Sequence, residues 1–174
     1  MDIGLSLIRL VVGLTLASHG AQKLFGWFGG YGVSGTGQFL ESLGFVPGRR
    51  AALLSGLTET GSGLLLALGL LTPLAAAGIV AVMLVAAISV HRSKGFFVSD
   101  GGYEYNLVQA AATVGVAFIG PGAWSLDAAL AFGWSGPPWG AAALALGLAG
   151  GAQQLLSRRR QTHPARTATL NTSA

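Results

Sequence analysis

The sequence contains no cysteine, and this absence excludes several kinds of redox site. Structural disulfides, iron–sulfur clusters held by thiolates, CxxC motifs and c-type haem attachment all require cysteine side chains. Any redox role of this chain must therefore use a bound carrier or a partner protein.

Charged residues are also scarce. They make up 9% of the 174 residues, whereas 52% are hydrophobic, and a soluble domain is about 25% charged. This composition is typical of an integral membrane protein, so we expect the lipid bilayer as its surroundings. The formal net charge is +4, but the basic residues flank apolar runs, and we therefore expect no nucleic acid as a partner.

Five apolar runs each have roughly the 17 to 25 residues that cross a hydrocarbon core of about 30 Å. They cover approximately residues 5–25, 51–71, 72–90, 103–120 and 138–156. We expect the first run to be a retained span and not a cleaved signal peptide, because Asp2 replaces a basic start and Arg9 interrupts the apolar stretch. The sequence thus predicts an all-α, polytopic membrane helix bundle.

The basic residues predict the orientation of these spans, because cytoplasmic loops carry an excess of lysine and arginine. Five spans place nine of the 10 basic residues on one side. We therefore predict that the N-terminus lies outside and the C-terminus in the cytoplasm. The nine are Lys23, Arg49 and Arg50 in the first loop, Arg92 and Lys94 in the third, and Arg158, Arg159, Arg160 and Arg166 in the tail.

The first loop, residues 26–50, contains the segment TGQFLESLGF. Its residues Phe39, Leu40, Leu43 and Phe45 are spaced for a short interfacial helix, with Glu41 facing water. The preceding GVSGTG follows no strand, so we expect a flexible turn there. Glycines inside the spans are predicted to let helices pack closely: Gly13, Gly20, Gly56, Gly61, Gly63, Gly147 and Gly151.

Six ionisable side chains lie within or beside the apolar runs, where a charge costs about 2.5 kcal/mol or more. Such side chains usually face the bundle interior and have a partner. Helical geometry places those of the first run on one narrow stripe together with two glycines. The six residues are Arg9, His19, Lys23, Glu59, Glu104 and Asp127.

Depth along the predicted helices indicates partners for these side chains. Glu59 and His19 lie at similar depth near the middle of their spans, which makes them candidates for handling a proton. Three pairs are expected: Glu59 with His19, Lys23 with Glu104, and Arg9 with Asp127.

Each of these side chains also has a purely structural interpretation. Lys23 and Arg9 can extend to the membrane surface as anchors, and Glu104 can be stabilised by the N-terminal end of its own helix. Glu59 can be a structural ion-pair partner, although a carboxyl near mid-membrane cannot reach water easily.

Histidines at two positions leave room for a metal or haem. His19 and His91 both approach the predicted cytoplasmic side, but neither has a second ligand one helical turn away. We therefore expect no firmly bound metal or cofactor.

Several motifs resemble the DoxX family of small bacterial membrane proteins. They are an early arginine, SHGAQKLFG (18–26), GLTETGSGLLLALGLLTPLAA (56–76), GGYEYNLVQAA (101–111) and GPGAWSLDAAL (120–130). The resemblance, over about residues 8–130, implies a four-helix core in the plasma membrane. The run after it is then an additional span, so the expected organisation is a core at 1–135, an extra helix at 136–157 and a basic, disordered tail at 158–174.

The family is associated with a thiosulfate-oxidising, quinone-reducing enzyme, and the resemblance therefore implies a subunit of a quinone-linked oxidoreductase complex. Such a subunit uses quinone as a substrate and works with soluble or membrane redox partner proteins. The alternative is a non-enzymatic membrane scaffold or a small-solute transporter.

Overall fold

The computed structural model describes residues 2–159, and their secondary structure is helical throughout, without strands. Seven α-helices follow one another in this part of the chain: α1 (Asp2–Phe25), α2 (Gly32–Ser42), α3 (Gly48–Leu68), α4 (Thr72–Ala86), α5 (Glu104–Ile119), α6 (Leu126–Ala129) and α7 (Pro137–Leu156). Short turns of other helix types lie between them at Trp27–Gly29, Ala87–His91, Arg92–Lys94 and Val98–Asp100.

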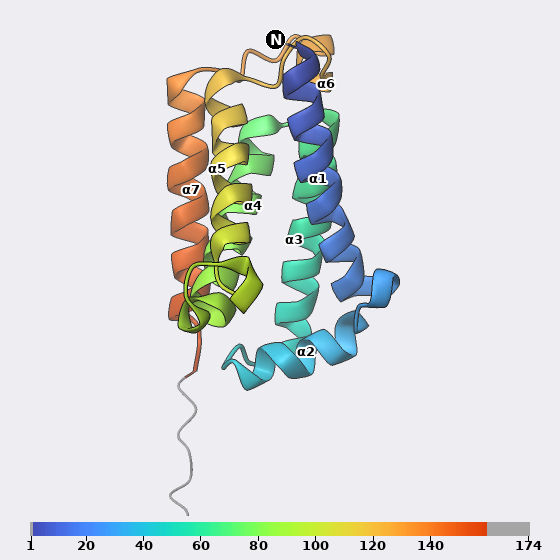
Figure 1. Cartoon of the computed structure of the whole chain (residues 1–174). Helices are drawn as coiled ribbons and strands as arrows, with labels where there is room; N and C mark the ends of the chain where they lie inside the picture. The colour runs from blue at the N-terminus through green and yellow to red at the C-terminus, as the bar shows by residue number, and fades with distance from the viewer. Residues whose placement is uncertain (1, 160–174) are drawn as a thin grey trace, which may run out of the picture.

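Three helical segments are long and apolar enough to cross a membrane: Asp2–Phe25, Gly48–Leu68 and Thr72–Lys94. α5 and α7 run beside them between the same two ends of the bundle (Figure 1). At 1.5 Å per residue, α5 is about 24 Å long and α7 about 30 Å long. The chain is therefore an all-α membrane helix bundle, and its helices begin and end within a few residues of the predicted apolar runs.

The bundle has two halves, joined by the short turn between α3 and α4. α1 packs mainly on α3, and α2 lies across the lower end of this pair. α7 packs on α4 and α5 in the other half (Figure 1). The C-terminal helix is thus an integral wall of the bundle.

Glycines bring the paired helices close together, as the sequence predicted. A Cβ at Gly63 of α3 would lie 2.5 Å from the carbonyl oxygen of Gly13 of α1, and one at Gly20 would lie 2.7 Å from that of Gly56. Gly147 packs similarly against Val80 of α4. Because no side chain separates these backbones, the helices gain close van der Waals contact.

Gly61 does not share this role. A Cβ at this position would meet nothing within 4 Å, so the expectation that Gly61 serves helix packing is wrong. It lies on α3 two residues before Gly63, which turns it away from α1.

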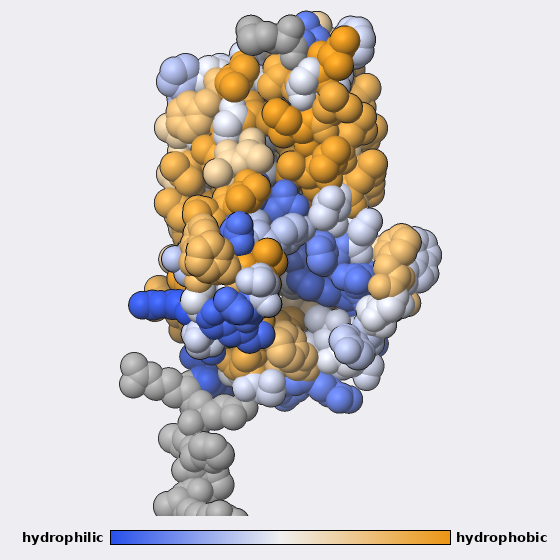
Figure 2. All heavy atoms as spheres, in the orientation of Figure 1, coloured by the Kyte–Doolittle hydropathy of each residue, from blue (hydrophilic) through white to orange (hydrophobic). Residues whose placement is uncertain are grey.

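The interior is apolar in its middle part. Seven buried side chains from α1, α3, α4 and α5 form the core cluster: Val12, Leu16, Leu66, Ala75, Ile79, Met83 and Val116. Large apolar side chains also cover much of the outer surface, shown in Figure 2 as a continuous orange area over the upper bundle. An outward apolar surface of this extent suits contact with lipid chains.

The first loop differs from its prediction at two places. GVSGTG is helical and opens α2, because Thr36 and Gly37 are buried where α2 packs on the start of α3. Leu43 and Phe45 lie beyond the last residue of α2, so the interfacial helix is shifted toward the N-terminus. Phe45 is buried at 3% exposure beneath the guanidinium of Arg158.

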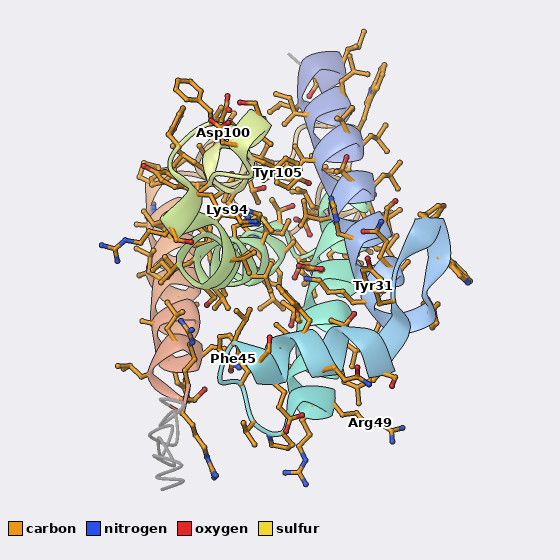
Figure 3. The ribbon with its side chains drawn as sticks, turned by 60° about the horizontal axis from the view of Figure 1, so that its bottom comes forward. Tyr31, Phe45, Arg49, Lys94, Asp100 and Tyr105 are labelled. Atoms are coloured by element: carbon orange, nitrogen blue, oxygen red, sulfur yellow. The ribbon has the colours of Figure 1, made fainter. Side chains whose placement is uncertain are left out.

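The lower end of the bundle collects the ends of several helices. Figure 3 views this end, with Arg49 and Lys94 on it together with Tyr31 and Phe45. The C-terminal end of α7 is attached here, since Arg158 Nε donates to the carbonyl of Leu43 at 2.9 Å. Arg160, Arg166 and the rest of the predicted disordered tail from 160 onward lie outside the described residues.

Candidate functional site

The centre of interest is an ion pair between α1 and α3. Lys23 Nζ donates to Glu59 Oε1 and also, at 2.9 Å, to the hydroxyl of Ser55. α1 and α3 run in opposite directions, so Lys23 lies about one turn below the Gly20–Gly56 contact and Glu59 about one turn above it. The two side chains meet because each leans toward the N-terminal end of its own helix. We call Lys23, Ser55 and Glu59 the inner polar centre.

The two charges of this centre differ in their exposure. The side chain of Glu59 is 3% exposed, whereas that of Lys23 is 29% exposed. Glu59 Oε2 is buried and has no hydrogen-bond partner in the described part of the chain. A buried carboxylate oxygen without a donor is costly, so this atom can accept a proton or a ligand's hydrogen bond.

His19 lies one turn before Lys23 on α1, but it is directed toward α5. Its ring contacts that of Tyr105 edge-on at 5.7 Å between centroids, and its Nδ1 lies 3.1 Å from Gln22 Oε1. The predicted pair of His19 with Glu59 is therefore wrong, and Lys23 takes that place. Equal depth along two helices does not require that side chains face each other across the bundle.

A polar hollow lies between the two halves of the bundle. Figure 2 shows it on the face where the half that holds α1 meets the half that holds α5. Tyr105 of α5 points toward this region (Figure 3), and its hydroxyl accepts a hydrogen bond from Gln109 Nε2 at 2.8 Å. Tyr105, Gln109 and Ser55 were missed by sequence reasoning; their spacing of four residues, from Tyr105 to Gln109 and from Ser55 to Glu59, is the signal that could have found them.

Glu104 has a structural role at the first residue of α5. Its Oε2 accepts from the backbone N–H of Val98 at 2.9 Å. The predicted pair with Lys23 is wrong, because Lys23 is bound to Glu59 and Glu104 fastens the loop before α5. The position also suits a carboxylate electrostatically, since it lies at the positive end of the helix.

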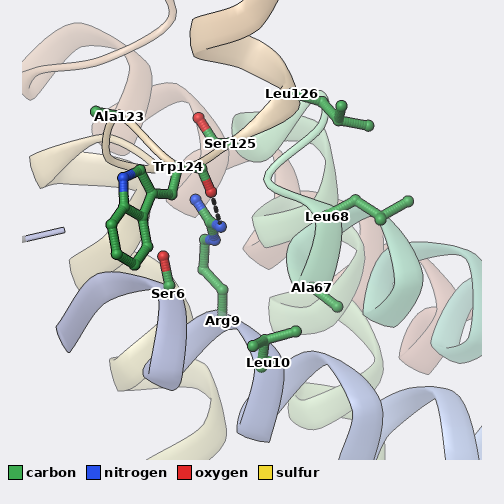
Figure 4. A pocket seen from close by; sticks show the side chains of 9 residues that line it. All are labelled: Ser6, Arg9, Leu10, Ala67, Leu68, Ala123, Trp124, Ser125 and Leu126. Atoms are coloured by element: carbon green, nitrogen blue, oxygen red, sulfur yellow. Dashed lines mark hydrogen bonds between the residues drawn. The ribbon is translucent and has the colours of Figure 1, made fainter. Parts of the chain in front are cut away.

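Arg9 and Asp127 lie at the opposite end of the bundle and bind backbone groups. Arg9 donates from both terminal nitrogens, to the carbonyl of Pro121 and to that of Trp124. Figure 4 draws the bond to Trp124. Asp127 accepts from the backbone N–H groups of Leu71 at 2.7 Å and Thr72 at 3.0 Å.

The predicted pair of Arg9 with Asp127 is thus replaced by bonds to the chain turns between them. The two charges still attract each other, but each holds a turn in place. Leu71 has a left-handed backbone with φ of 49°, which is unfavourable for leucine, and the Asp127 carboxylate stabilises this conformation. Gly69, with φ of 63°, provides the space for the Arg9 guanidinium.

Residues 2–159 contain no group of three or more metal-ligating side chains. His91, one of the two histidines considered as ligands, has its Nδ1 2.6 Å from the carbonyl of Gly101 in the following loop. This contact ties the loop to the helical turn Ala87–His91, which follows α4.

Comparison with known families places these observations in context. The family model DoxX matches residues 4–92, which include Arg9, His19, Lys23 and Glu59. No curated protein and no solved structure matches the chain. The match covers just over half of the sequence, and its span contains the whole inner polar centre. The chain therefore belongs to the DoxX family.

Proposed function

We propose that this protein is the membrane subunit of a quinone-linked oxidoreductase complex, in which the inner polar centre handles the proton that accompanies quinone reduction. The observation that carries the proposal is the state of Glu59. One of its oxygens is paired with Lys23, and the other is buried and has no hydrogen-bond partner. Such a carboxylate has one free position for a proton in a region of low dielectric constant.

His19 supplies a route between this carboxylate and the surroundings. It is exposed beside the polar hollow and lies one helical turn from Lys23. An imidazole gains and loses a proton in the physiological range more readily than other side chains do. Protons therefore pass from water through His19 toward the Lys23–Glu59 pair.

The quinone enters from the lipid phase. Its ring carbonyls accept hydrogen bonds from His19 of α1 and from the hydroxyl of Tyr105 of α5, whose rings face each other. Gln109 holds the Tyr105 hydroxyl in place through its own hydrogen bond. Reduction of one quinone to quinol consumes two electrons and two protons. The electrons come from a sulfur compound that is oxidised by a soluble or membrane partner protein, and the protons come through the inner polar centre.

The same proposal gives the chain an orientation in the bacterial plasma membrane. We place the lower end in the cytoplasm, because it carries Arg49, Arg50, Arg92, Lys94 and, just after α7, Arg158 and Arg159. The N-terminus then lies outside, and protons for the quinone are taken from the cytoplasmic side. Labelling of the variants Ser34→Cys and Ser135→Cys in intact cells tests this orientation. Only the thiol at position 135 should react with a membrane-impermeant reagent.

The test of function uses the tagged full chain, purified in mild detergent with the proteins that accompany it. Reduction of decylubiquinone is measured with thiosulfate, sulfite or sulfide as the electron donor. We expect Glu59→Gln to lower the rate at least tenfold, since the amide cannot take part in proton transfer. Asp100→Asn is the matched control, because this exposed acid lies in the loop before α5, outside the centre.

The opposite results would identify the alternative function. A preparation that retains no quinone and reduces none with any of these donors removes the oxidoreductase assignment. The inner polar centre would then hold α1 and α3 in register in a non-enzymatic scaffold or transporter.

A further inference from the structure

A second hollow lies at the other end of the bundle, on the lipid-facing side of Arg9 (Figure 4). It has a volume of about 510 Å³ and is open to one side of the molecule. Its walls are mostly apolar, with Leu10 of α1, Leu68 of α3, and Trp124 and Leu126 of the segment after α5. The proposed quinone chemistry does not use this hollow.

Two side chains that line this hollow each carry a buried polar atom that has no hydrogen-bond partner in the described part of the chain. These atoms are the Nε of Arg9, a residue only 3% exposed, and the hydroxyl of Ser6. Ser6 and Arg9 are three residues apart and lie on the same side of α1. Both atoms can donate, and a donor that is buried at membrane depth needs an acceptor because no bulk water is present there.

The charge balance of the site favours an acceptor that is electrically neutral. Arg9 carries a positive charge, but the nearby Asp127 supplies a compensating negative charge, and two backbone carbonyls already bind the guanidinium. An anionic ligand would add a charge that nothing here neutralises. A neutral oxygen that only accepts hydrogen bonds, such as a carbonyl, fits the site better.

The position of the site along α1 indicates which molecule supplies this carbonyl. Arg9 lies about 10 Å along α1 from the first helical residue, and its side chain reaches back toward that end to contact Pro121 and Trp124. The guanidinium therefore lies near the boundary between hydrocarbon and headgroups, which is the level of the ester carbonyls of phospholipids. Acyl chains attached to such an ester would continue along the apolar walls.

We propose that this hollow binds one phospholipid through an ester carbonyl, which accepts hydrogen bonds from Arg9 Nε and the Ser6 hydroxyl. The lipid completes the hydrogen bonding of the buried arginine. It also attaches the 121–126 segment to α1 and α3 from the lipid side. This site is independent of the proposed redox function, because it uses none of the residues of the inner polar centre.

The test compares ester-linked with ether-linked phosphatidylglycerol of the same chain length, because the ether form lacks the carbonyl. The full chain is equilibrated in mild detergent with equal amounts of both lipids, and native mass spectrometry measures which lipid it retains. We expect at least a fivefold excess of the ester form. Ser6→Ala, which removes a hydroxyl without a protein partner, should lower this excess to less than twofold.

A pair of matched variants tests the location. Leu68→Trp fills the hollow and should abolish the preference, whereas Leu64→Trp, one turn away on the same exposed side of α3, should leave it unchanged. An equal retention of both lipids by the parent protein would overturn the proposal, as would the same ester preference in Ser6→Ala and Leu68→Trp. Retention of a quinone in place of a phospholipid would equally refute the assigned ligand.

Discussion

Replacing Lys23 by methionine removes one partner of the ion pair and leaves the carboxylate of Glu59 behind. Breaking a buried ion pair from one side costs about 3–5 kcal/mol, because the remaining charge has no partner. Since the side chain of Glu59 is only 3% exposed and has few ways to reach water, we expect a loss of about 3 kcal/mol, at the lower end of that range.

The converse substitution should cost less. Glu59→Gln leaves the ammonium of Lys23, whose side chain is 29% exposed and already bonds to Ser55. This charge can turn toward the hollow, so we expect a loss of about 1 kcal/mol, similar to that of an exposed pair. The structure therefore predicts an asymmetry between two substitutions that break the same contact.

Unfolding in mixed dodecylmaltoside and dodecyl sulfate micelles, followed by far-ultraviolet circular dichroism, measures these free energies. The variant that carries both Lys23→Met and Glu59→Gln should lose about 2 kcal/mol less than the sum of the two single losses. Lys94→Met is the control, because Lys94 is an exposed lysine of the α4–α5 loop, and its loss should stay within about 0.5 kcal/mol. Additive single losses, or a larger cost for Glu59→Gln than for Lys23→Met, would refute the assigned burial and pairing.

Three further predictions concern glycines and use the same unfolding measurement. Gly13→Leu should cost more than about 2 kcal/mol because it separates α1 from α3, whereas Gly61→Leu should be nearly neutral, since that position is open; equal losses would contradict the packing. Gly69→Ala should lower the free energy of unfolding by about 1–3 kcal/mol, because the residue has a φ of 63° and borders Arg9. An unchanged stability would contradict this backbone conformation and this contact. Gly147→Ala should destabilise by about 1–3 kcal/mol through a clash with α4. Gly150→Ala should be tolerated, because a Cβ there would lie 3.8 Å from the Cβ of Ala81, an ordinary contact distance. A larger loss for Gly150→Ala than for Gly147→Ala would show that another face of α7 packs on α4.

The helices could be predicted well because the signals that define them are local. Runs of apolar residues of membrane length identify their positions, and the small residues Gly13, Gly20, Gly56 and Gly63 indicate which faces pack. Gly61 shows the limit of this reasoning, since a glycine inside a span is no proof of a helix contact. α2 was predicted only in part, because its first turns depend on the packing of Gly37 against α3, which is a tertiary contact.

The pairing of the charges could not be predicted from depth alone. Depth gives the height of a side chain along the bundle, but the partner also depends on rotation about each helix axis and on the competing backbone groups. His19 and Lys23 differ by about 40° around α1, and this difference directs one toward α5 and the other toward Glu59.

Backbone hydrogen bonding explains why Arg9 and Asp127 are held by chain turns at one end of the bundle, whereas Glu59 keeps an oxygen without a partner in the described part of the chain. At the N-terminal end, the carboxylate of Asp127 accepts hydrogen bonds from two backbone N–H groups, and the guanidinium of Arg9 donates to two backbone carbonyls. These charges therefore mainly stabilise turns. At the inner centre, the charges meet between two regular helices whose backbone groups are already bonded within the helices, and Glu59 consequently keeps an oxygen without a donor. A carboxylate held between regular helices is therefore the one to test for proton transfer, whereas one that caps a turn is occupied by the fold itself.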